Sequence, residues 1–286
     1  MRLNEIKNLK IISVSRKVPN YLKKLKNIKL IKADFSKKKS LYKNLSNKKF
    51  DVVINFGGNI DHKNKLQTQK SHFNLCKNLV DFFRKKKILL FLQAGSSLEY
   101  GKKKSPNQEE DKCKPISFYG KSKLKSTEYL KQSGLNFIVL RLYQIYGPFQ
   151  KINRIIPLAI YNLKKSKSFD SSSGIQLRDF LYIDDFVNLI IKIIKTKKIK
   201  SGIFNVGFGK PISIKHVLNI IEKRIKFGKV KYGKIKMRKD EPKVLFPKIK
   251  KIKKYFEWYP KTKLDLGLKK TIKFYEKEIP FNKHNN

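Results

Sequence analysis

The chain has 286 residues, of which 40% are hydrophobic and 12% aromatic. This composition excludes an intrinsically disordered protein and is sufficient for a large core in one two-lobed unit. Lysine and arginine outnumber the acidic residues by 69 to 21, a net charge of +48, but the lysines are spread along the chain and no specific nucleic-acid partner is expected.

Two short apolar strands are expected near the start of the chain, over residues 9–15 and 29–33. Ser15 and Arg16 come at the end of the first strand, and Asp34 and Phe35 follow the second. Residues 1–8 resemble the end of a helix. The first glycine is Gly57, so the chain carries no glycine-rich turn for a pyrophosphate in this region.

A third strand is expected over residues 51–56, and Gly57 and Gly58 at its end would allow the backbone to approach a ligand. A helix over residues 71–85 and a fourth strand over 88–94 follow. The fourth strand leads into the sequence GSSLEYG at residues 95–101. Ser96 therefore lies at the carboxyl end of a strand, the edge at which ligands bind in open α/β sheets.

The next helix, expected over residues 118–133, carries Tyr119 and Lys123 at positions i and i+4, so both side chains lie on one face. An ammonium beside a phenol stabilises the phenolate, which suits the phenol to accept and return a proton. A hydroxyl from Ser96 would bind the same substrate oxygen. A Tyr-x-x-x-Lys pair alone is common in a lysine-rich chain, but after Ser-Ser-x-x-Tyr-Gly it indicates hydride transfer at a carbinol carbon.

Further strands are expected over residues 136–142 and 203–206, with a helix over 185–195. The alternation of apolar strands and helices predicts an α/β fold with a doubly wound parallel sheet. After Pro148 the elements become shorter, and residues 168–174 have the composition of a loop. We therefore expect a larger domain in residues 1–148 and about 175–207, and a smaller lobe in residues 149–174 and 208–286.

Five segments beside the Ser-Ser-x-x-Tyr-Gly and Tyr-x-x-x-Lys patterns resemble a known family. The family is the extended short-chain dehydrogenase/reductases, the NAD-dependent epimerase/dehydratase group that acts on nucleotide sugars. The segments are FDVVINFGG (50–58), LRLYQIYGP (140–148), RDFLYIDD (178–185), FNVG (204–207) and WYP (258–260). The resemblance covers nearly the whole chain and implies a Rossmann-like domain for NAD or NADP, followed by a smaller lobe for a nucleotide-sugar substrate.

The same resemblance implies a role for individual residues. It assigns catalysis to Ser96, Tyr119 and Lys123. Besides Tyr119 and Lys123, the positions that it assigns to the cofactor are Ser15, Arg16, Asp34, Phe35, Phe56, Gly57, Gly58 and Tyr143. Those that it assigns to the substrate are Ser97, Gln144, Arg178 and Arg238, of which the two arginines would bind a diphosphate.

The end of the first expected strand bears on the choice of cofactor. An acidic residue there would bind the adenosine 2′-hydroxyl, whereas the planar guanidinium of Arg16 suits a 2′-phosphate, which favours NADP over NAD. The alternative is that Arg16 is one more surface cation. Asp34 resembles the aspartate that reaches the adenine amino group in this family.

Relatives begin with a strand and a glycine-rich turn that this sequence lacks. We therefore expect that about twenty residues of the first βαβ unit are missing from its start. The alternative is a catalytically silent relative that acts as a binding or scaffold protein. A third hypothesis is a polyanion-binding protein that has reused the fold.

The reaction can be narrowed within the family. Its dehydratases carry Asp-Glu directly after the catalytic Ser or Thr, and the corresponding residues here are Ser97 and Leu98. Leu98 cannot transfer a proton, and Glu99, on a strand-like path, would face the other way. Dehydration is therefore disfavoured, which leaves 4-epimerisation or 4-keto reduction of a nucleotide sugar.

The remaining expectations concern location and partners. Cys76 and Cys113 lie far apart, and neither they nor the four histidines have metal-ligand spacing, which predicts a metal-free protein in a reducing cytoplasm. No apolar run approaches the roughly twenty residues of a membrane span. Relatives commonly dimerise through the helices expected over 71–85 and 118–133, so a homodimer is expected.

Overall fold

The structure is a computed structural model that describes residues 9–18, 20–23, 25, 27–59, 64–237 and 241–278. The chain forms two compact units. The first contains the chain up to Gly101, Cys113–Arg141 and Ile191–Ile203, and the second contains Lys102–Lys112, Leu142–Ile190 and the chain from Phe204. The expectation that residues 1–8 end a helix falls outside the described residues.

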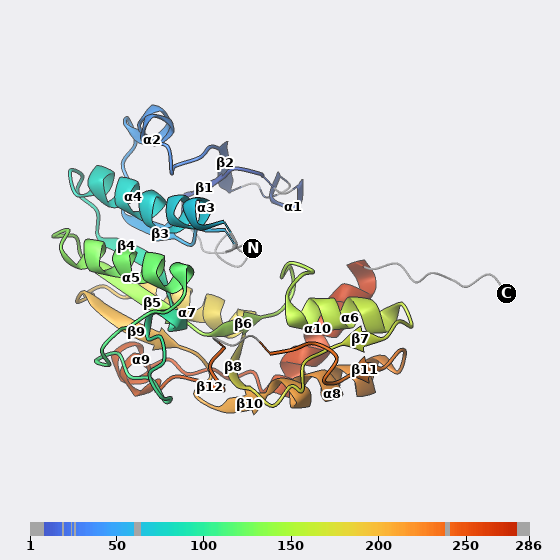
Figure 1. The fold of residues 1–286 in the computed structure, drawn as a ribbon. Coiled ribbons are helices and arrows are strands. Elements are labelled where there is room, and N and C mark those ends of the chain that lie inside the picture. Colours follow the sequence, from blue (N-terminus) through green and yellow to red (C-terminus); the bar gives the residue numbers. More distant parts are fainter. Residues whose placement is uncertain are drawn as a thin grey trace. The chain divides into compact units, whose positions relative to one another are not determined.

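The first unit alternates strands and helices, as the sequence pattern predicts (Figure 1). Its strands are β1 (Ile11–Ser15), β2 (Ile28–Lys32), β3 (Val52–Asn55), β4 (Leu90–Ser96) and β5 (Phe137–Leu142), and β9 (Gly202–Val206) begins in it. Its helices are α1 (Asn20–Lys23), α2 (Lys38–Leu45), α3 (Lys65–Gln69), the π-helical turn η2 (Lys70–Asn74), α4 (Leu75–Phe83), the 3-10 turn η3 (Ser97–Glu99) and α5 (Phe118–Lys131).

Parallel pairing brings the carboxyl ends of neighbouring strands to the same edge. β1 pairs with β2 and β3 pairs with β4, both in parallel, and β3, β4, β5 and β9 form one sheet in that order. Every residue of β4 is buried, as expected for a strand covered on both faces. The α/β fold predicted from the sequence is confirmed.

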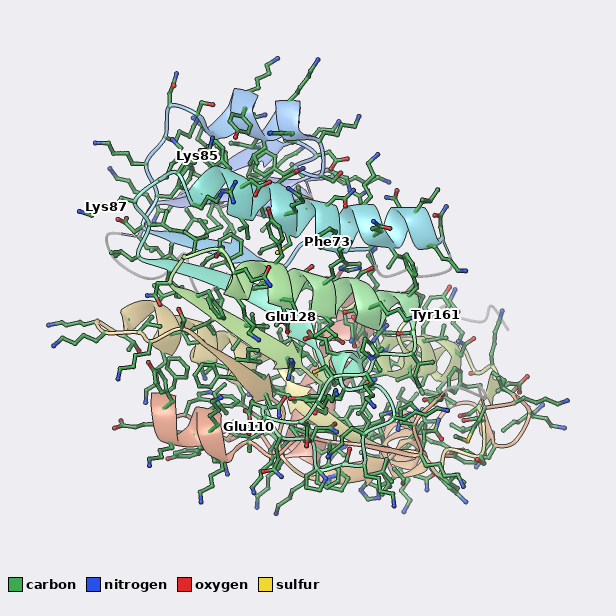
Figure 2. All side chains as sticks on the ribbon, turned by 60° about the vertical axis from the view of Figure 1, so that its left-hand side comes forward. Phe73, Lys85, Lys87, Glu110, Glu128 and Tyr161 are labelled. Carbon is green, nitrogen blue, oxygen red and sulfur yellow. The ribbon has the colours of Figure 1, made fainter. Side chains whose placement is uncertain are left out.

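Helices α4 and α5 run side by side along the sheet (Figures 1 and 2). Their inner faces pack with strand residues into one core that includes Val80, Phe83, Phe91, Leu130 and Val139. The first of these helices begins earlier than predicted. It was expected from residue 71, but the helical path starts at Lys65, because Asn64 caps it by accepting a hydrogen bond from the backbone N–H of Gln67 at 2.9 Å.

The second unit is built around β8 (Leu177–Tyr182), which pairs with β6 (Gln144–Tyr146), β10 (Pro211–Ser213) and β12 (Val244–Leu245). Its remaining elements are α6 (Ile155–Lys164), β7 (Phe169–Asp170), α8 (Ile214–Ile225), β11 (Val230–Lys231), α9 (Lys250–Phe256) and α10 (Leu264–Glu278), and α7 (Ile183–Lys195) begins in it. These pairings explain why residues 177–182 belong to the second unit, whereas the sequence pattern grouped them with the first domain.

The core of the second unit lies among α6, α8 and α10 and includes Tyr146, Ile160, Phe180, Leu218 and Leu268. The segment 168–174, expected to be a loop, contains β7, which pairs in parallel with β11.

None of the helices that the structure describes is both long and apolar enough to cross a membrane. Lys85 and Lys87, just beyond α4, are exposed, in keeping with a solvated basic surface (Figure 2).

Candidate active site

The end of β4 turns sharply at Ser96. The Ser96 hydroxyl accepts a hydrogen bond from the backbone N–H of Leu98 at 3.2 Å, and the Glu99 side chain accepts one from the backbone N–H of Ser96 at 2.8 Å. This reciprocal arrangement is a capping box, and it begins η3. The expected strand-like path through Glu99 is therefore wrong: the chain coils here, and Glu99 turns inward and is fully buried.

Helix α5 begins directly beside this turn. The Ser117 hydroxyl caps it by accepting a hydrogen bond from Gly120 N–H at 3.1 Å. Gly120 lies so close to the turn that an added Cβ would approach the carbonyl oxygen of Leu98 to 2.5 Å, so only glycine allows this contact. Tyr119 therefore enters the helix next to the turn that carries Ser96 and Ser97.

Lys123 is held by the end of β4. Its ammonium donates a hydrogen bond to the carbonyl oxygen of Ala94 at 2.8 Å and lies 5.8 Å from the ring centroid of Tyr119. Only 4% of Lys123 is exposed, so its charge is largely removed from water. The ring of His72, from η2, meets the Tyr119 ring edge-on at 4.9 Å. The structure thus brings Tyr119 and Lys123 together, as their spacing predicts.

The residues after β1 and β2 share one edge, because Ala33 N–H donates to Ser15 O at 3.1 Å as the parallel pair ends. Asp34 accepts hydrogen bonds from the Ser36 hydroxyl at 2.6 Å and from the Ser36 N–H at 3.0 Å. Partial burial raises the pKa of Asp34. The two hydrogen bonds from Ser36 and the charge of Arg16 lower the pKa by more, so it lies below its ordinary value. The Phe35 side chain is buried in the core, and Arg16 is exposed.

The two glycines after β3 are closely approached by neighbouring side chains. A Cβ on Gly57 would lie 2.4 Å from a methyl carbon of Leu75, and one on Gly58 would lie 2.2 Å from the His72 ring. Glycine at these positions is thus explained by neighbouring side chains of η2 and α4. The side chain of Phe56 is 46% exposed.

In the second unit, a pocket of about 270 Å³ contains two of the four residues assigned to the substrate, Gln144 and Arg178. Arg178 is buried and forms an ion pair, since its guanidinium donates a hydrogen bond to the Glu241 carboxylate at 2.6 Å. Arg154 also lines the pocket and donates to the Gln144 side chain at 3.5 Å. Two cations and one carboxylate therefore surround this pocket.

Gln176 lines the same pocket, and its side-chain oxygen is buried without a hydrogen-bond partner among the described residues. Gln176, Arg154 and Glu241 were missed from the sequence, where nothing distinguishes them from surface polar residues. Arg238 lies outside the described residues. Tyr143, assigned to the cofactor, is buried, and its hydroxyl donates to the Asn107 side chain at 2.9 Å within the second unit.

Comparison with known proteins gives the class of protein that this fold and site define. Residues 2–207 match the model of the NAD dependent epimerase/dehydratase family. A UDP-glucuronate 4-epimerase from Thermodesulfobacterium geofontis is 30% identical over 91% of this chain and 83% of its own length. The chain belongs to the NAD dependent epimerase/dehydratase family, and the resemblance seen in its sequence is confirmed.

Other relatives are more distant. A dTDP-4-dehydro-6-deoxyglucose reductase from Escherichia coli is 27% identical over 82% of this chain and 78% of its own length. The structure of a variant UDP-glucuronic acid 4-epimerase from Bacillus cereus, in complex with NAD and a fluorinated UDP-sugar, superposes with a TM-score of 0.87. It is 22% identical, with 97% of this chain and 94% of that chain covered, and shows the shared fold.

Proposed function

We propose that this protein is an NAD(P)-dependent nucleotide-sugar 4-epimerase. The observation that carries the proposal is the pairing of Tyr119 with the buried ammonium of Lys123 beside the turn at Ser96. The reaction class is supported by the 30% identical relative from Thermodesulfobacterium geofontis, a UDP-glucuronate 4-epimerase.

In this proposal each of the three residues has one task. Bound nicotinamide supplies an acceptor, and then a donor, for the hydride on carbon 4 of the sugar. Tyr119 takes the proton of the 4-hydroxyl as the carbon is oxidised and returns it as the ketone is reduced. Lys123 stabilises the phenolate of Tyr119. Ser96 donates a hydrogen bond to the same sugar oxygen.

The residues that follow β1 and β2 in the first unit suit the binding of a dinucleotide. Asp34 is held ionised by Ser36 and Arg16 at the carboxyl edge of β1 and β2, so it can accept hydrogen bonds from an amino or hydroxyl group of adenosine. Arg16 is exposed at the same edge, where its guanidinium suits a 2′-phosphate. We therefore retain NADP as the favoured cofactor over NAD. Ser15, Phe56, Gly57, Gly58 and Tyr143 remain proposed cofactor residues.

The pocket in the second unit is proposed to bind part of the substrate. Ligand pockets usually measure about 300–1,000 Å³, so about 270 Å³ suits one portion of a nucleotide sugar rather than the whole molecule. Arg178 and Arg154 would bind the diphosphate, and the unpaired oxygen of Gln176 would accept an N–H from the base. Ser97, Gln144 and Arg238 complete the proposed substrate contacts.

A second candidate is reduction of a 4-keto sugar, favoured by the similarity to the Escherichia coli reductase. Dehydration is disfavoured because Leu98 cannot act as an acid or base and because Glu99 is fully buried in an ion pair with Arg141. We further propose a cytoplasmic homodimer that associates through α4 and α5, which sedimentation in solution would test.

The proposal is tested by incubating the purified chain with NAD or NADP and UDP-glucuronate or UDP-glucose, with NMR of the sugar to follow inversion at carbon 4. We expect inversion, and we expect Tyr119→Phe to lower kcat by about 10³-fold, since a positioned general acid/base contributes about 10²–10⁴. Reduction of a 4-keto sugar without inversion would favour the reductase. Failure to bind either dinucleotide or to convert any sugar would favour a catalytically silent relative.

A further inference from the structure

Glu99 joins three elements of the first unit through its two carboxylate oxygens. One oxygen accepts the backbone N–H of Ser96, at the end of β4, at 2.8 Å. The other accepts the hydroxyl of Thr127, on α5, at 3.1 Å and the guanidinium N–H of Arg141, on β5, at 3.0 Å. Glu99 and Thr127 are fully buried, and Arg141 is 2% exposed.

A buried ion pair is poor evidence of a purely stabilising role. Removing two charges from water is costly, and well-packed apolar residues of similar size are often equally or more stable. Arg141 also stacks on the ring of Tyr100, with its guanidinium carbon 4.6 Å from the ring centroid. A hydrogen-bonded cluster of this kind does fix geometry, because each hydrogen bond restricts the orientation of the group that donates it.

The groups that Glu99 orients belong to the proposed catalytic residues. Its bond to the Ser96 N–H fixes the turn from which the Ser96 hydroxyl projects. Thr127 follows Lys123 by four residues and Tyr119 by eight on α5, so all three lie along one face of that helix. The carboxylate of Glu99 therefore ties the backbone of Ser96, at the end of β4, to the helix face that carries the phenol and the ammonium.

We propose that Glu99 is a positioning residue that holds Ser96 in register with Tyr119 and Lys123. The inference rests on the proposed function, since it assigns to those three residues the roles given above. Glu99 touches neither substrate nor cofactor in this account. Its effect on turnover passes through Ser96, and this sets it apart from a residue that only stabilises the fold.

A double-mutant cycle tests this directly. With UDP-glucuronate and NAD, we expect Glu99→Gln to lower kcat by about 10²-fold, the effect of a displacement of about 1 Å, with KM changed less than about threefold. In a Ser96→Ala background, Glu99→Gln should lower kcat by less than about threefold. Independent, multiplicative losses would overturn the inference, as would a loss of folded protein with normal kcat in the folded fraction.

Thr127→Val provides a milder variant in case Glu99→Gln does not fold. It removes one hydrogen bond to Glu99 and leaves the ion pair with Arg141 intact. We expect kcat to fall by about fivefold, within the tenfold that corresponds to about 1.4 kcal/mol. The matched control is Thr271→Val, which removes another fully buried hydroxyl, one that donates to Gly267 O in its own helix at 2.7 Å. Equal effects on kcat in the two valine variants would contradict the inference.

Hydrogen exchange separates this inference from the proposed function. If no UDP-sugar is converted by the parent protein, the proposed function fails, but the positioning can still be measured. The Ser96 amide should exchange at least tenfold faster in Glu99→Gln than in the parent, and amides of β3 should be unchanged. An unchanged Ser96 amide would refute the positioning role whatever the enzyme activity.

Discussion

The proposed catalytic region in the first unit and the proposed substrate pocket in the second unit differ in which group of the protein pairs with their buried cation. In the first unit, Lys123 is anchored by the backbone carbonyl of Ala94 on β4, and its ammonium lies beside the Tyr119 ring. In the second unit, Arg178 is paired with the carboxylate of Glu241. If the proposed function holds, the first region is preorganised for one proton transfer, whereas in the second an anionic ligand would have to compete with a carboxylate of the protein.

This difference follows from the kind of contact that each region uses. The anchor of Lys123 is a backbone group at the end of a fully buried strand, so its position is set by the sheet. Glu241 is a side chain that can rotate away, and 19% of its side chain is exposed. Rigid elements position catalytic groups well, and adjustable side chains suit a site that admits and releases a ligand.

The sharpest test of the preorganised region is Lys123→Met. Removing the ammonium takes one of two donors from Ala94 O, which still accepts from the Gln93 side-chain amide at 2.9 Å, and leaves the Tyr119 phenolate without its cation, so we expect kcat to fall by about 10²-fold. Steady-state kinetics with UDP-glucuronate measures this. Lys121→Met, an exposed lysine on the same helix, should retain parental kcat. Equal losses in both variants would mean that general charge, and not this contact, matters.

Asp179, next to Arg178, tests whether a fixed polar cluster also supports the second unit. Its buried carboxylate accepts the backbone N–H groups of Phe208 and Gly209, both at 2.6 Å, and of Lys210 at 3.2 Å. Asp179→Asn would direct amide hydrogens at some of these donors, so the free energy of unfolding in urea should fall by about 2 kcal/mol. The control variant Asp170→Asn, at an exposed position on β7, should change it by less than about 0.5 kcal/mol. A smaller loss for Asp179 would show that this loop can rearrange.

The proposed contact of Arg178 with the diphosphate is tested by Arg178→Met. If Arg178 binds the diphosphate, the KM for a UDP-sugar should rise about tenfold with kcat little changed, because the lost contact is made in the ground state and the transition state alike. Arg224→Met, which breaks the ion pair of Arg224 with Asp265 in the same unit, is the control and should leave KM unchanged. A fall in kcat instead would place Arg178 closer to the reacting atoms.

Much of the fold was visible in the sequence because it depends on local patterns. Strands expected over 136–142 and 203–206 are observed at Phe137–Leu142 and Gly202–Val206. Helix α3 was missed because its residues, KLQTQ, carry one apolar side chain, which leaves no hydrophobic periodicity to detect.

Contacts between distant residues were not visible in the sequence. Tyr119 and Lys123 are four residues apart, so helical geometry alone predicts that they meet. Glu99 meets Arg141 across 42 residues, and Arg178 meets Glu241 across 63. No spacing rule predicts such pairs, which is why the inward turn of Glu99 and the partner of Arg178 emerged only from the structure.

The smallest predicted effect concerns the cofactor at the edge of β1 and β2. If exposed Arg16 binds a 2′-phosphate, Arg16→Ala should weaken NADP binding by about fivefold and leave NAD binding nearly unchanged, since an exposed charge pair contributes at most about 1 kcal/mol. Fluorescence titration of NADPH and NADH measures both. Lys17→Ala, the adjacent exposed cation, is the matched control for general charge. Equal weakening in the two variants would mean that the surface, and not Arg16, attracts the phosphate. Tighter binding of NAD than of NADP by the parent would contradict the preference for NADP.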